Sequence, residues 1–155
     1  MNEDQAQERA KIIFAGVLWS FPSAHDSIYR PGTPIGYLEG VTHELGHILA
    51  AGIPLSRAKR QRAGMNYGGD LGFYVENHAR GQRQEFEALA IETLVFEFAG
   101  LPLDYVELLV QASDHENYVS PVDIADRSIR GLMKEPRVIE HARLIARWYL
   151  GMERA

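Results

Sequence analysis

The chain has 155 residues, which is enough for one compact domain with its own hydrophobic core. Its formal net charge is −5, which argues against a general nucleic-acid binder, because such proteins need a basic surface. It contains no cysteine, so disulfides and thiolate ligands are excluded, and any metal site must use His, Asp or Glu.

The amino-terminal residues predict a helix and no targeting signal. The opening MNEDQAQERAK is acidic and polar, unlike a secretory signal, and the apolar run at 12–21 is too short to span a bilayer. We therefore expect a cytoplasmic protein without a membrane span. Apolar spacing predicts a helix over residues 4–19, and the prolines and glycine of residues 21–34 predict a loop. Trp19 and Trp148 lie on apolar helix faces and are expected in the core.

A second helix is predicted from Thr33 or Pro34 to about residue 51. Proline suits the first turn of a helix, and Gly52 and Pro54 are typical of its end. The apolar residues follow helical spacing and predict a buried helix; they are Leu38, Val41, Leu45, Ile48 and Leu49.

The remaining chain is predicted to be mostly helical, with one strand. Residues 55–63 fit an extended segment, and Leu71–Glu76 is aromatic and β-branched, as strands are. Further helices are expected over 80–99, 102–112, 121–133 and 136–151. The predicted fold class is α+β, mainly α-helical, with a small sheet between the second helix and a carboxy-terminal helical bundle.

The second helix carries the sequence HELGH at residues 43–47, which matches the H-E-x-x-H pattern. Two histidines four residues apart project from one face of a helix and can bind one Zn²⁺ through ring nitrogens. Glu44 lies one residue after His43, where it can reach the water on the metal and act as general base. The pattern therefore predicts His43 and His47 as zinc ligands. The alternative is a helix with two exposed or core-capping histidines, which the surrounding apolar residues oppose.

A catalytic zinc site needs a third protein ligand, and helical periodicity alone leaves its identity open. Ile53 stands six residues after His47, where the metzincins have a third histidine. The candidates are acids and one histidine further along the chain: Glu85, Glu87, Glu92 and Glu97 on one helix, and Asp114, His115, Glu116, Asp123 and Asp126 beyond it. A glutamate on the 80–99 helix would make a site like that of the gluzincins.

Residues 41–133 resemble the zinc peptidase domain of the FtsH family. That family carries HEAGH on a helix, then a Gly-containing turn before a Leu-Gly-Tyr strand; here THELGHILAAGIP is followed by Asp70-Leu71-Gly72-Phe73. The family's later Gly-Gly pair resembles Ala99-Gly100, and its Asn-Asp-Leu helix start resembles Val122-Asp123-Ile124. Two departures are Pro102-Leu103-Asp104 in place of Ala-Ala-Glu and Val122 in place of the Asn.

The resemblance implies Asp123 as the third zinc ligand, although Asp123 could instead cap its helix behind Ser120 and Pro121. It also suggests that Leu71, Gly72, Phe73 and Tyr74 form an edge strand that binds substrate by strand addition; a plain core strand is the alternative. We expect one domain over 1–155, with a divergent helix and loop at 1–32 and a peptidase core at 33–151.

The implied function is hydrolysis of peptides or unfolded proteins by a zinc metalloendopeptidase. The family's AAA ATPase has no counterpart here, since no G-x-x-x-x-G-K-[ST] pattern occurs, so we expect a reaction independent of ATP. Two other interpretations stay open: a non-catalytic binding module with a structural or absent metal, and a metal hydrolase that acts on another kind of bond.

Overall fold

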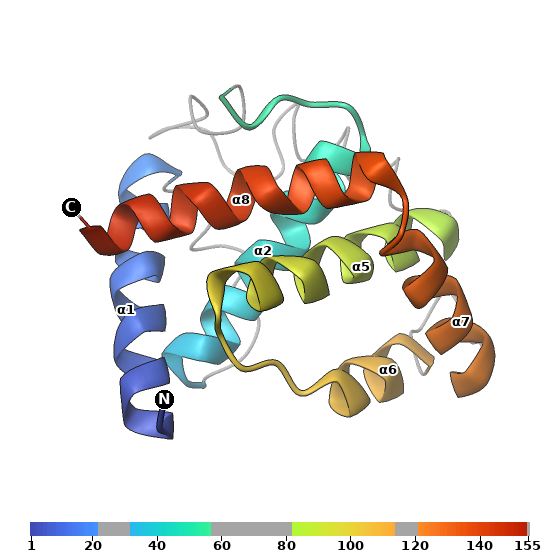
Figure 1. Ribbon diagram of the computed structural model, residues 1–155, viewed down its shortest axis with the longest axis horizontal. Coiled ribbons are helices and arrows are strands. Elements are labelled where there is room, and N and C mark those ends of the chain that lie inside the picture. The colour runs from blue at the N-terminus through green and yellow to red at the C-terminus, as the bar shows by residue number, and fades with distance from the viewer. Residues whose placement is uncertain (22–31, 57–81, 114–120, 155) are drawn as a thin grey trace.

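The computed structural model describes residues 1–21, 32–56, 82–113 and 121–154 (Figure 1). Within these ranges the chain forms six helices that pack around one hydrophobic core. In chain order they are α1 (Glu3–Ser20), α2 (Pro34–Ala50), α5 (Gln82–Ala99), α6 (Tyr105–Ser113), α7 (Val122–Leu132) and α8 (Pro136–Arg154).

The two ends of α2 follow from its sequence. Thr33 is the N-cap, and its hydroxyl accepts a hydrogen bond from the Gly36 amide at 3.2 Å, with Pro34 in the first turn. At the other end Gly52 has φ +82°, a conformation that favours glycine, and its amide donates to the Leu49 carbonyl. The bounds predicted for this helix are confirmed to within one residue.

Helix α2 is buried between α1, α5 and α8, and α5 and α8 also pack against each other (Figure 1). The approach of α2 to α5 is especially close at Gly46, where a Cβ atom would lie 3.1 Å from the carbonyl oxygen of Ala88. A buried hydrogen bond of 2.8 Å between Thr42 and Tyr149 joins α2 to α8. These contacts fix α2 against α5 along the part that carries the HELGH sequence.

The amino-terminal helix α1 is held at the carboxy-terminal end of α5. The guanidinium of Arg9 donates to the carbonyl oxygens of Ala99 and Gly100 at 2.6 and 2.8 Å, and to the Glu153 carboxylate at 2.7 and 2.8 Å. A cation beside the last carbonyls of a helix also compensates the helix dipole. One arginine therefore joins α1 to the ends of α5 and α8.

The predicted α+β fold class is wrong, because the described residues form helices and no strand. The apolar face of α2 is already covered by other helices, and α5 packs on it directly, so no sheet lies between them. The strand predicted at 71–76 lies outside the described residues. Of the extended segment predicted at 55–63, the structure describes Leu55 and Ser56, and both are helical instead.

One tryptophan was also wrongly expected in the core. Trp19 is 84% exposed, because α1 buries the stripe formed by Ala6, Ala10, Ile13 and Val17, and Trp19 falls outside it. Trp148, also expected in the core, is partly buried and packs against it. Among the described helices, none combines the length and the apolar character that crossing a bilayer requires.

Candidate metal centre

The two histidines of HELGH lie on the face of α2 that meets α5. His47 is 7% exposed and His43 is half-buried, and their rings meet edge to face with centroids 4.7 Å apart. Their Nε2 atoms are 3.1 Å apart. The four-residue spacing thus brings the two ring nitrogens together at one point, as the sequence predicted.

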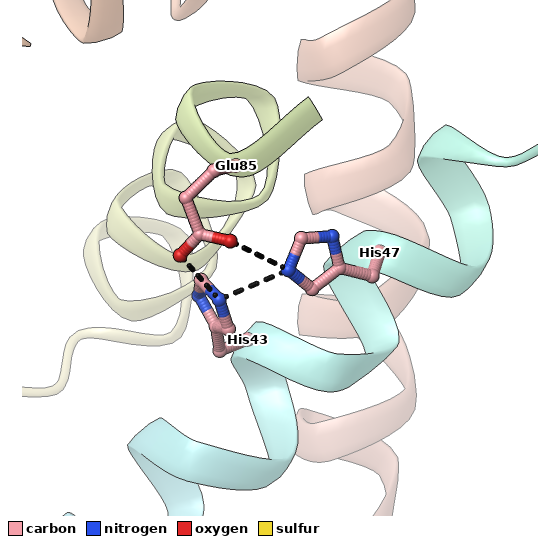
Figure 2. A group of neighbouring side chains, drawn as sticks. All are labelled: His43, His47 and Glu85. Atoms are coloured by element: carbon pink, nitrogen blue, oxygen red, sulfur yellow. Dashed lines mark hydrogen bonds and ion pairs between the residues drawn. The ribbon is translucent and has the colours of Figure 1, made fainter. Parts of the chain in front are cut away.

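Glu85 on α5 completes this group. Its Oε1 lies 3.0 Å from His43 Nε2, and its Oε2 lies 3.0 Å from His47 Nε2, so one carboxylate faces both rings (Figure 2). Glu85 is 8% exposed, in the first turn of α5. Of the described residues, these three form the group whose ligand atoms are close enough to hold one metal ion.

The spacing of these atoms is close to that of a tetrahedral zinc site. Ligand atoms 2.0–2.1 Å from Zn²⁺ at tetrahedral angles lie about 3.3–3.4 Å from one another. The two Nε2 atoms are 3.1 Å apart, a few tenths of an ångström less, and each lies 3.0 Å from a different oxygen of Glu85. One ligand atom from each of the three residues lies within 4.8 Å of the other two. Two imidazoles and a carboxylate are also a common ligand set for zinc. His43, His47 and Glu85 could therefore occupy three of the four positions.

The electrostatics of the group are those of a buried acid beside two histidines. Burial lowers the pKa of His43, but the charge of Glu85 and hydrogen bonds to Glu85 and Glu92 outweigh it, and the pKa is raised well above 6.5. Burial raises the pKa of Glu85, but the two histidines outweigh it, and the pKa is lowered far below 4.5. Without a metal, the pair is stabilised as imidazolium and carboxylate.

Three other acids of α5 were candidates for the third ligand, and they face different surroundings. Glu92 is 6% exposed and contacts the far edge of the His43 ring, with Oε1 3.2 Å from Nδ1. Glu87 is 4% exposed and forms an ion pair with Arg137 of α8. Glu97 is exposed.

Asp123, the ligand implied by the family resemblance, is exposed on the first turn of α7 and is not part of the group. It does not cap α7 either: Pro121 is the N-cap, and no side chain makes a capping hydrogen bond. Asp126 accepts hydrogen bonds from Tyr105 at 2.6 Å and Arg130 at 2.7 Å. The candidates at 114–116 and the strand residues Leu71, Gly72, Phe73 and Tyr74 lie outside the described residues.

Glu44, the predicted general base, is half-buried on α2 directly after His43. The sequence places Glu85 among the candidates for the third ligand but does not distinguish it from the other acids. One available signal was the seven-residue spacing of Glu85 and Glu92, which places both acids on one helix face, two turns apart. That face is the one that α5 turns toward the histidines.

A scan of protein-family models, a search of curated proteins and a search of solved structures each found no match to this chain. The resemblance to the FtsH peptidase domain therefore stays a prediction.

Proposed function

We propose that this protein is a zinc-dependent peptidase that hydrolyses peptides or unfolded proteins without ATP. The observation that carries the proposal is the meeting of His43, His47 and Glu85 at one point, with Glu44 next to the first histidine. An H-E-x-x-H helix with a glutamate from a second helix is the arrangement used by zinc peptidases.

Each residue has a distinct role in this proposal. His43, His47 and Glu85 would hold the metal, and their three positions leave a fourth for water or substrate. Zinc, when bound, supplies a Lewis acid that polarises the substrate carbonyl and lowers the pKa of water toward neutrality. Glu44 accepts the proton of the attacking water and passes it to the leaving amine as the peptide bond breaks.

We assign the third ligand to Glu85 in place of Asp123. The support is geometric, since the Glu85 carboxylate is 3.0 Å from both Nε2 atoms whereas Asp123 is exposed at the start of α7. Helix α5 is also packed closely on α2, so the backbone that carries Glu85 is held in place without a bound ion. Such preorganisation favours metal binding and a fixed site geometry.

The test compares wild type with Glu44→Gln, which preserves the size of the side chain and removes the base. We expect both proteins to contain one zinc per chain by elemental analysis, and the variant to lose about 10²–10⁴-fold in hydrolysis of an unfolded protein. Wild type purified without chelators and still free of zinc would contradict the proposal. Zinc-loaded wild type that cleaves nothing would instead support the non-catalytic binding module.

A further inference from the structure

The structure places a second carboxylate on the outer edge of the His43 ring. Glu92 Oε1 lies 3.2 Å from Nδ1 of His43, while Nε2 of the same ring faces Glu85 and His47. The two nitrogens of an imidazole lie on opposite edges of the ring, so Glu92 approaches the edge that faces away from the metal-binding group. Glu92 is not a member of that group.

The surroundings of Glu92 favour a hydrogen bond from Nδ1 of His43. It is 6% exposed, and a buried carboxylate needs a hydrogen-bond donor. The hydroxyls of Thr42 and Tyr149 do not supply this donor. Thr42 donates to the Leu38 carbonyl, so the hydroxyl of Tyr149 must donate to Thr42. That pair also anchors α2 to α8 at the residue before His43.

We propose that Glu92 is a positioning residue for the metal site. It accepts a hydrogen bond from Nδ1–H of His43 and holds the ring in the tautomer whose Nε2 lone pair faces His47 and Glu85. A neutral imidazole carries one N–H, so a proton held at Nδ1 leaves Nε2 free to bind a metal. This inference rests on the proposed zinc site and adds to it the residue that orients one ligand.

A carboxylate behind a ligand histidine fixes the ring orientation and makes its other nitrogen a stronger ligand. Loss of such a partner typically lowers metal affinity by about 10–100-fold. Glu87 offers a matched control, because it is equally buried on α5 but pairs with Arg137 and not with the site. An effect that depends on the contact with His43 should therefore appear at Glu92 and not at Glu87.

The experiment measures the zinc dissociation constant by competition with a chromophoric chelator for wild type, Glu92→Gln, Glu92→Ala and Glu87→Gln. We expect Glu92→Ala to weaken zinc binding about 10–100-fold. Glu92→Gln keeps the acceptor oxygen and loses the charge, so it should lie between Glu92→Ala and wild type. Glu87→Gln should bind zinc as wild type does. Circular dichroism and thermal unfolding confirm that each variant is folded.

A second readout reports the tautomer directly. In zinc-free protein Glu85 also faces Nε2 of His43, so ¹⁵N-labelled histidine NMR is recorded in a Glu85→Ala background at a pH where His43 is neutral. The Nδ1–H form should be present there and should be lost when Glu92→Ala is added. A Glu92→Ala protein that binds zinc like wild type and keeps the Nδ1–H form overturns the positioning role and leaves the proposed peptidase intact. Equal losses in Glu92→Gln and Glu87→Gln overturn it as well, because they indicate a general effect of α5. Wild type that binds no zinc overturns the proposed function, and the positioning role with it.

Discussion

Helix α5 presents buried glutamates to two different neighbours, and the contrast locates the site. Toward α2, Glu85 and Glu92 contact the histidines of HELGH. Toward α8, Glu87 forms an ion pair with Arg137, a cation that does not titrate in the physiological range. The same residue type on the same helix therefore pairs with an arginine on one face and with the histidines of the candidate metal centre on the other.

The difference also explains why burial alone does not identify a ligand. The three acids are similarly buried, at 8, 4 and 6% exposure for Glu85, Glu87 and Glu92. What separates them is the partner: an arginine keeps its charge, whereas a histidine can lose its proton and leave the carboxylate able to share a metal cation. Substitutions that act on one face of α5 and spare the other test this difference directly.

The largest effect is expected from removing Glu85. Glu85→Ala takes away one of three ligands and should weaken zinc binding by more than the roughly 100-fold that loss of an orienting residue can cost. Glu87→Ala should keep zinc affinity and lower the free energy of unfolding by about 1 kcal/mol, at the low end because Arg137 is largely exposed. Chelator competition and urea unfolding measure both; similar zinc affinities for the two variants would remove Glu85 from the site.

Zinc binding should also depend steeply on pH. The pKa of His43 is raised in the zinc-free protein, and zinc needs the neutral ring, so binding releases a proton below that pKa. The affinity should rise about tenfold per pH unit through this range and level off above the pKa of His43. Isothermal titration in two buffers of different ionisation enthalpy counts the released proton, and binding independent of pH would contradict the assignment.

The zinc-free protein should show a different pH dependence of stability. The raised pKa of His43 stabilises the fold fully below about pH 6.5, and this contribution is lost as pH rises through the raised value. The lowered pKa of Glu85 stabilises the fold above about pH 4.5, and this contribution is lost as pH falls toward the lowered value. With chelator present, the pair therefore contributes most between about pH 4.5 and 6.5, so Glu85→Ala should lower Tm most in that window and flatten the Tm profile on either side of it.

A smaller effect is expected from widening the contact between α2 and α5. In Gly46→Ala the new Cβ would lie 3.1–3.2 Å from backbone atoms of Ala88, so the helices must separate slightly. We expect a net loss of about 1 kcal/mol of stability and weaker zinc binding. Gly131→Ala, where the Cβ meets nothing within 4 Å, should gain about 0.5–1 kcal/mol. Thermal unfolding of both variants tests the pair, and a stabilised Gly46→Ala would indicate loose packing.

Sequence reasoning predicted the helices well because local signals define their ends. Thr33 and Pro34 begin α2, and Gly52 ends it, each through backbone chemistry that acts within a few residues. The pairing of His43 with His47 follows from helical spacing alone. These features needed no knowledge of which helices meet.

The proposed third ligand could not be selected in the same way, because its position depends on how two distant helices pack. Glu85 lies about forty residues beyond His43, and its role follows from the side of α5 that the close contact at Gly46 turns toward α2. Asp123 was implied by a resemblance of short motifs, which carries no information on packing. The predicted sheet failed for a related reason, since an aromatic and β-branched segment does not reveal what covers α2.

The most direct test of the metal centre is a crystal structure of zinc-loaded protein with anomalous scattering recorded on both sides of the zinc edge. We predict one anomalous peak about 2.0–2.1 Å from Nε2 of His43, Nε2 of His47 and a carboxylate oxygen of Glu85. A peak bound by Asp123 in place of Glu85, or no peak at the histidines, would contradict a zinc site formed by His43, His47 and Glu85.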